Sequence, residues 1–223
     1  MNGVSTDFQS DGEMIEVRSD IIYRFIKRTF DFIISGLSLI LLSPIFLLIA
    51  LLIKMDSKGK VFYKHKRIGK NGETIYLYKF RSMYSDSKER LEELLKDPVI
   101  RKEWEENYKL DHDPRITKLG NILRKTSLDE LPQLLNILNG DMSIVGPRPV
   151  IEDELEKYGL YKQKFLSVTP GLTGWWACNG RSCTSYEDRM KLELYYVDHR
   201  SIKLDLKVIY KTFISVIKRD GAK

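Results

Sequence analysis

The feature that most constrains the fold of this 223-residue chain is an uncharged apolar run at residues 32–53. As an α-helix this run would measure about 33 Å, close to the roughly 30 Å hydrocarbon core of a bilayer. It is too long for the apolar region of a signal peptide, and no small-residue cleavage site follows it. A buried core helix is the alternative, but the length favours a segment embedded in a membrane.

The centre and the flanks of this run bear on how it would sit in a membrane. Ser43-Pro44 lies near its centre. Proline removes a backbone donor and clashes with the preceding turn, so we expect the helix to break there. Basic residues flank both ends, so the excess of positive charge on cytoplasmic loops gives no orientation. A kinked spanning helix and a helix–break–helix that enters and leaves the same face both fit the segment.

Composition narrows the classes of protein and partner. Hydrophobic residues make up 43% and charged residues 30%, which supports a packed core and excludes wholesale disorder. The net charge of +6 favours anionic partners such as phosphates and acidic lipids. Cys178 and Cys183 are too few for a disulfide scaffold or a four-cysteine zinc site. Without a recognised motif or a dense basic stripe, we expect no nucleic-acid partner.

The remaining patterns predict a mainly helical α+β fold with a small β-hairpin. Residues 61–67 and 74–80 are rich in aromatic and β-branched side chains and are separated by a Gly-Lys-Asn-Gly turn. Helical patterns follow at residues 85–96, 99–108, 116–125 and 131–138. A further amphipathic helix is expected at the C-terminus, with an apolar stripe formed by Leu206, Ile209, Phe213, Val216 and Ile217. This stripe can lie on a membrane or pack on the domain.

The densest group of chemically active side chains lies in the segment RKTSLDELPQ at residues 124–133. A capping box from Ser127 to Glu130 would place Pro132 fifth in the helix, where proline loses a hydrogen bond. A helix with Asp129 as its N-cap instead puts Pro132 in the first turn. The Asp129 carboxylate would then lie at the positive end of the helix dipole and near Arg124, which favours its ionised form. Phosphoryl transfer and structural capping both fit these residue types.

Cationic side chains elsewhere are candidates for binding phosphate. Lys79 and Arg81 bracket a phenylalanine in the second predicted strand. Arg148 stands between two prolines, which restrict the backbone and suit a guanidinium aimed at a phosphate. The tandem Trp175-Trp176 can stack a base, lie at a membrane interface or pack in the core.

A series of motifs occurs in order along the chain: KRxFD at 27–31, the apolar run with Ser43-Pro44, RxGKxG at 67–72, YKFRSM at 78–83, DPRIT at 113–117, RKTSLDELPQL at 124–134, GDMS at 140–143, VGPRP at 145–149 and PGLTG at 170–174. In this order they resemble the bacterial sugar transferase family, the monotopic polyprenyl-phosphate phosphoglycosyltransferases. The resemblance runs from about residue 24 to the end and is strongest to the catalytic part of larger hexose-1-phosphate transferases.

The resemblance implies transfer of a sugar 1-phosphate from a UDP-sugar to undecaprenyl phosphate, with release of UMP. It implies that Asp129 is the nucleophile and forms a covalent phosphosugar intermediate. Mg²⁺ is expected as the cofactor, held by Asp129 and Glu130. Phosphates are expected to be bound by four cations, Arg124, Arg148, Lys79 and Arg81. Direct attack by the lipid phosphate, with Asp129 as a base, is the alternative mechanism, and a non-catalytic membrane-anchored subunit is the alternative class of protein.

The family's broken helix enters a single leaflet, so the resemblance favours the re-entrant form. The expected organisation is a flexible tail at residues 1–20, a re-entrant membrane hairpin at 21–60, a cytosolic catalytic domain at 61–200 and a basic amphipathic helix at 201–223. We expect the chain in the bacterial inner membrane, with the catalytic domain on the cytoplasmic face. A homodimer is compatible with the sequence. His65-Lys66 and Ala177-Cys178 depart from the usual pattern, which leaves the identity of the sugar open.

Overall fold

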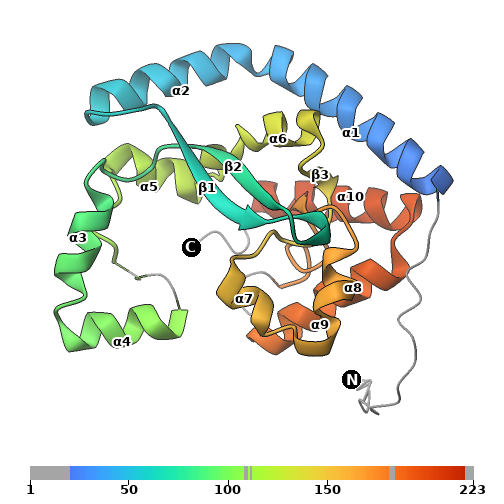
Figure 1. Ribbon diagram of the computed structural model, residues 1–223. Helices are drawn as coiled ribbons and strands as arrows, with labels where there is room; N and C mark the ends of the chain where they lie inside the picture. Colours follow the sequence, from blue (N-terminus) through green and yellow to red (C-terminus); the bar gives the residue numbers. More distant parts are fainter. Residues whose placement is uncertain (1–20, 108–109, 111, 181–183, 219–223) are drawn as a thin grey trace.

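The computed structural model describes residues 21–107, 110, 112–180 and 184–218 (Figure 1). The tail expected at residues 1–20 and the side chain of Cys183 lie outside this part of the chain. Within it the fold is α+β and mainly helical, as the patterning predicts.

The elements are, in chain order, α1 (Ile21–Leu41), α2 (Ser43–Asp56), β1 (Phe62–Ile68), η1 (Lys70–Gly72), β2 (Thr74–Phe80), α3 (Ser87–Leu94), α4 (Pro98–Asn107), α5 (Lys118–Lys125), η2 (Leu128–Glu130), α6 (Gln133–Asn139), β3 (Ser143–Val145), α7 (Glu152–Glu156), η3 (Gly159–Tyr161), α8 (Lys162–Leu166), β4 (Gly171–Thr173), α9 (Tyr186–His199) and α10 (Ile202–Lys218), where η marks a 3₁₀ turn. β1 and β2 form the predicted antiparallel hairpin. The short parallel pair of β3 and β4 was not predicted, because each strand has only three residues.

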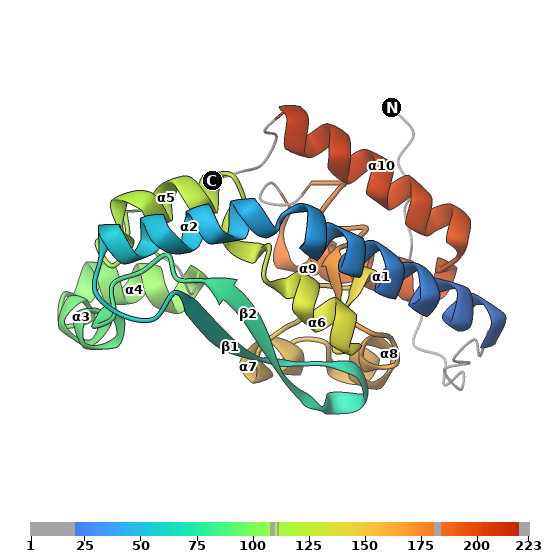
Figure 2. The ribbon, with the colours of Figure 1, turned by 90° about the horizontal axis from the view of Figure 1, so that it is seen from above.

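The helices α1 and α2 form one bent pair that arches over the rest of the molecule (Figures 1 and 2). The bend is 60° and falls at the predicted Ser43-Pro44 break, which is confirmed. Pro44 lies in the first turn of α2, where a missing backbone donor costs no helical hydrogen bond. Among the described helices none is long and apolar enough by itself to cross a membrane, whereas this pair meets both criteria when its helices are taken together.

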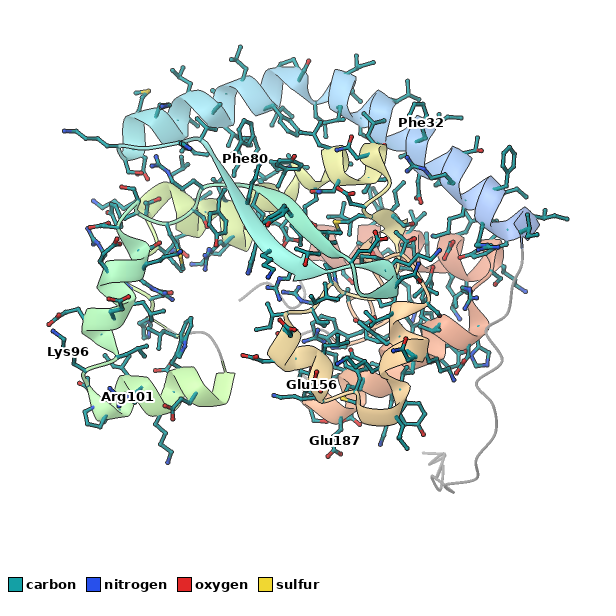
Figure 3. The ribbon with its side chains drawn as sticks, in the orientation of Figure 1. Phe32, Phe80, Lys96, Arg101, Glu156 and Glu187 are labelled. Carbon is teal, nitrogen blue, oxygen red and sulfur yellow. The ribbon has the colours of Figure 1, made fainter. Side chains whose placement is uncertain are left out.

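The two sides of the bent pair differ sharply in exposure. Ile49 and Ile53, on the side of α2 that faces the domain, are buried against Phe80 of the hairpin. Phe80 is 1% exposed, whereas Phe32 on the other side of the pair is 55% exposed (Figure 3). Many large apolar side chains share the exposure of Phe32, among them Phe25, Leu37, Ile40, Leu41, Leu47, Leu51 and Met55. Such a continuous apolar surface marks a face that contacts a membrane or another protein.

Polar side chains of α1 fasten the bent pair to the domain. Lys27 forms an ion pair of 2.8 Å with Asp205 of α10. Arg28 donates to the last carbonyls of α6 at 2.5 and 2.7 Å. Buried Asp31 accepts a hydrogen bond of 3.0 Å from a backbone N–H of β3, donated by Ile144. The KRxFD motif therefore joins the apolar helix to three separate elements.

The C-terminal helix is present as α10, but its exposed stripe differs in part from the predicted one. Leu206 and Phe213 are exposed together with Ile202 and Tyr210 on one helix face, whereas Ile209 packs against the core. Val208 is fully buried in the domain. The side chains of the other predicted members at 216 and 217 lie outside the described part of the chain.

Candidate functional site

The acidic pair lies on a tight turn between α5 and α6. Ser127 adopts the left-handed conformation, with φ of 56°, and the 3₁₀ turn η2 follows directly. A non-glycine residue in this region is uncommon and is found preferentially at functional sites.

The predicted start of the following helix was wrong. α6 begins at Gln133 with Pro132 as its N-cap, so Asp129 is not a capping residue, and Ser127 makes no capping hydrogen bond either. The chain turns instead because Leu128 and Leu131 pack against the buried core beneath α2.

Burial dominates the electrostatics of Asp129. It raises the pKa of this carboxyl to about 6, with a further upward contribution from the charge of Glu130. The charges of Lys79 and Arg124 act in the opposite direction but do not outweigh burial. The predicted direction of the pKa shift is therefore wrong, because no α-helix begins at Asp129 and burial of the carboxyl opposes its ionisation. Near neutral pH a pKa of about 6 still leaves most of this group ionised.

A cationic pocket opens next to this turn. Glu130 and Lys79 line it and form an ion pair of 2.6 Å. Arg67 and Arg148 line it as well, and burial, together with the charge of Arg148, lowers the pKa of Arg67 to about 10. His65 lies two positions before Arg67 on β1. It is neutral near pH 7, because burial and the charges of Arg67, Lys79 and Arg148 lower its pKa to about 4. The pocket therefore concentrates positive charge beside the acidic pair.

Close backbone approach shapes the opposite wall of the pocket. Gly146 donates to the carbonyl of Thr173 at 2.9 Å, and Gly171 donates to the carbonyl of Pro147 at 2.8 Å. A Cβ on Gly146 would lie 2.5 Å from the Thr169 carbonyl oxygen, so no larger residue fits there. This packing of β3 against β4 fixes the loop that carries Arg148.

The four predicted phosphate-binding cations are only partly brought together. Lys79 and Arg148 line the pocket. Arg124 donates to the Ser82 hydroxyl at 2.9 Å and acts on Asp129 through its charge, without lining the pocket. Arg81 is elsewhere: its buried guanidinium donates to the backbone carbonyls of Ile53, Ser57 and Lys58 at the end of α2. The expectation that Arg81 binds phosphate does not fit this placement.

The two tryptophans, for which three roles were left open, are separated by the structure. Trp176 lines the pocket, whereas Trp175 stacks on Tyr195 with a centroid distance of 5.5 Å. Gln133 and Glu193 were not singled out at all. The signal for Glu193 was available: it is the one acidic residue in the otherwise apolar and aromatic stretch LELYYV at residues 192–197.

Comparison with known proteins agrees with this geometry. Residues 22–219 match a family model described as bacterial sugar transferase. An undecaprenyl-phosphate galactose phosphotransferase of Salmonella typhimurium is 46% identical over 200 residues, which cover 89% of this chain and 42% of that protein. The exopolysaccharide production protein ExoY of Sinorhizobium fredii is 48% identical over 197 residues, covering 88% and 87%. A UDP-glucose:undecaprenyl-phosphate glucose-1-phosphate transferase of Escherichia coli is 37% identical over 199 residues, covering 86% and 40%.

Proposed function

The chain belongs to the bacterial sugar transferase family, and on that basis we propose that it transfers a sugar 1-phosphate from a UDP-sugar to undecaprenyl phosphate and releases UMP. Relatives named for this chemistry with galactose and glucose support the proposal, although the chain spans only 42% and 40% of their length. The observation that carries it is the placement of Asp129, a buried carboxyl that feels the charges of Lys79 and Glu130, two residues that form an ion pair and line a cationic pocket.

The proposed reaction has two displacements at one phosphorus atom. An Asp129 oxygen attacks the phosphorus that carries the sugar, and the bond from this phosphorus to the UMP oxygen breaks. UMP leaves, and the sugar phosphate is held as an acyl phosphate on Asp129. An oxygen of undecaprenyl phosphate then attacks the same phosphorus, which forms the diphosphate-linked lipid and restores the carboxylate.

The cations of the pocket have a direct part in this scheme. The donor and the acceptor together bring several negative charges to one place. Arg67, Lys79 and Arg148 offer fixed positive charges in a site whose walls are already positioned by β3 and β4. Preorganised charge of this kind is usually the largest contribution to phosphoryl-transfer catalysis.

Mg²⁺ fits the donor atoms that are present. In the described part of the chain no group of three or more His, Cys, Asp or Glu side chains could hold a metal ion. Mg²⁺ needs only one or two carboxylates when substrate phosphates complete its shell. Asp129 and Glu130 are adjacent carboxylates, and the charge of Glu130 adds to the burial that raises the pKa of Asp129; a divalent cation relieves their repulsion. We expect them to hold the ion, which would neutralise charge on the diphosphate, and we expect activity to vanish in a chelator and return with Mg²⁺.

The bent pair suits a re-entrant segment on the cytoplasmic face of the inner membrane. Both of its helices pack on the same domain: α1 through Lys27, Arg28 and Asp31, and α2 through Ile49 and Ile53. A helix that crossed the bilayer would have to leave the domain along part of its length. A pair held along one side can bury its exposed face in a single leaflet, where a cytosolic UDP-sugar meets a lipid-anchored phosphate.

The test is a half-reaction with UDP-sugars in the absence of lipid. If Asp129 is the nucleophile, purified protein releases UMP and gains a hydroxylamine-sensitive label from radiolabelled donor. Direct attack by the lipid phosphate predicts no UMP until acceptor is added. Turnover with acceptor present but without UMP release or label in its absence would favour that alternative. No transfer to lipid with any of a panel of UDP-sugars would favour a non-catalytic subunit.

A further inference from the structure

One wall of the pocket carries a buried carboxyl that the mechanism above leaves unused. Glu193 of α9 is 1% exposed and lines the pocket. Its Oε1 atom accepts a hydrogen bond of 3.1 Å from the backbone N–H of Arg148. Its Oε2 atom is buried without a hydrogen-bond partner among the described residues. A buried oxygen without a hydrogen-bond partner lowers the stability of a fold. Its position at a pocket therefore indicates that a bound ligand supplies the missing hydrogen bond.

The position of Oε2 relative to the pocket walls is well defined. A Cβ built on Gly174 would lie 3.8 Å from Oε2, so the oxygen stands beside the glycine backbone of that wall. The guanidinium of Arg148 lies 5.9 Å from the ring centroid of Trp176, which lines the same wall. The charge of Arg148 acts both on Glu193 and on Arg67.

The chemistry of a carboxylate limits what this oxygen can bind. It accepts hydrogen bonds and repels phosphate, so its partner on a UDP-sugar is an N–H or an O–H. In-line displacement places the leaving UMP opposite the attacking Asp129 oxygen, which directs the nucleoside across the cations toward Arg148. The guanidinium of Arg189 lies 4.8 Å from the centroid of the Trp176 ring and that of Arg148 lies 5.9 Å from it, so the flat surface next to Oε2 that suits a base is the backbone of Gly174. Uracil presents a single ring N–H between two carbonyls, which matches a single free acceptor.

We propose that Glu193 is a specificity-determining residue for the donor, with Oε2 accepting a hydrogen bond from the N3–H of uracil while Oε1 holds the backbone at Arg148. This inference rests on the proposed function of the chain. The two oxygens of Glu193 would have separate roles: one binds the base, and the other fixes the loop that presents Arg148 to the diphosphate.

The experiment compares a UDP-sugar with its N3-methyluridine analogue, in which the N–H is replaced, by steady-state release of the nucleoside monophosphate with undecaprenyl phosphate present. For the unmodified protein we expect kcat/KM to fall at least about tenfold with the methylated donor, since a buried acceptor loses its partner. In Glu193→Leu the natural donor should be impaired and the ratio between the donors should fall to about one. Glu193→Gln keeps an accepting oxygen and should preserve most of the ratio, which covers the case in which the leucine variant does not fold.

Exposed Glu187 of the same helix provides the control, and Glu187→Gln should leave both values unchanged (Figure 3). A merely structural role for Glu193 predicts equal losses with both donors and an unchanged ratio, which would overturn the proposal. Equal use of the two donors by the unmodified protein would overturn it as well. Absence of UMP release and of transfer with any UDP-sugar would instead overturn the proposed function itself.

Discussion

Asp129 and Asp205 are equally buried, at 7% exposed, yet their surroundings are opposite. Asp205 accepts from Tyr23 at 2.9 Å, from Lys27 at 2.8 Å and from Tyr196 at 2.6 Å, so both of its oxygens are satisfied. Asp129 has an acidic neighbour in Glu130, and desolvation raises its pKa to about 6. The same degree of burial therefore accompanies a stabilising contact between α1 and α10 at Asp205, and a raised pKa of the candidate nucleophile at Asp129.

The same contrast appears between Asp31 and Glu193. Asp31 accepts from the backbone of β3 at 3.0 Å and joins α1 to the domain. Glu193 is even more buried, but one of its oxygens has no partner among the described residues, and burial raises its pKa to about 7. A buried carboxyl with an unpartnered oxygen at the pocket is the pattern expected where a fold gives up stability for function.

The largest effect is expected for Asp129→Asn. The amide keeps the shape but lacks the anionic oxygen, so UMP release and lipid labelling should fall by about 10⁴-fold or more. Because ionised Asp129 is desolvated, the same substitution should leave the melting temperature unchanged or raise it. Paired activity and thermal-unfolding measurements in detergent test this. A variant that loses activity together with several degrees of melting temperature would contradict the assignment.

Asp205→Ala should show the reverse behaviour. Removing the acceptor breaks the ion pair with the partly buried Lys27 ammonium and the hydrogen bonds from the Tyr23 and Tyr196 hydroxyls, and should cost about 3 kcal/mol of unfolding free energy. The folded fraction should keep a normal kcat, because Asp205 does not line the pocket. Glu93→Ala, which breaks an exposed pair with Lys96, is the matched control and should change little. Loss of kcat without loss of stability would remove the distinction between the two regions.

The pH dependence should separate the carboxyl of Asp129 from that of Glu193. Both pKa values are raised, so both groups keep a proton to higher pH than usual. The kcat/KM for UMP release should therefore rise through pH 6 to 7, and Glu193→Gln should leave only the rise near 6. Stability has the opposite sign, because the folded state binds these protons more tightly: their contribution is fully present below about pH 4 and is lost as pH rises through 6 and 7. Thermal melts across this range provide the check.

The sequence predicted those parts of the molecule that depend on local chemistry. Pro44 cannot continue the hydrogen bonding of the preceding helix, and the Gly-Lys-Asn-Gly turn joins two strands, with Asn71 and Gly72 at positive φ. The acidic pair was found because two carboxylates next to cations are unusual. The conformation around Asp129 was not predicted, because the start of α6 depends on the packing of Leu128 and Leu131 beneath α2.

The missed residues depend on contacts between distant parts of the chain. Glu193 meets the pocket only because α9 packs beside the Arg148 loop, 45 positions away in sequence. The pairing of β3 with β4 joins two three-residue strands that carry no periodic signal. Arg81 and Arg148 looked alike in sequence, as arginines beside rigid or aromatic neighbours, yet one caps a helix and the other lines the pocket.

That last difference gives the smallest and most discriminating prediction. Arg81 donates to Ser57 at 2.6 Å, and also to the carbonyls of Ile53 and Lys58, where the C-terminal end of α2 needs donors. A lysine keeps the charge but cannot serve three carbonyls with a planar fork, so Arg81→Lys should cost about 1 kcal/mol of unfolding free energy. Its KM for the UDP-sugar should stay unchanged.

Arg148→Lys is the counterpart, and it should raise the KM for the donor severalfold with little change in the melting temperature, because its side chain faces the pocket. If Arg81→Lys instead raised the KM while the protein stayed equally stable, Arg81 would belong with the phosphate-binding cations after all. The end of α2 would then need another explanation for its stability. Because both substitutions conserve charge, the comparison isolates geometry: the same residue type stabilises a helix end in one region and binds substrate in the other.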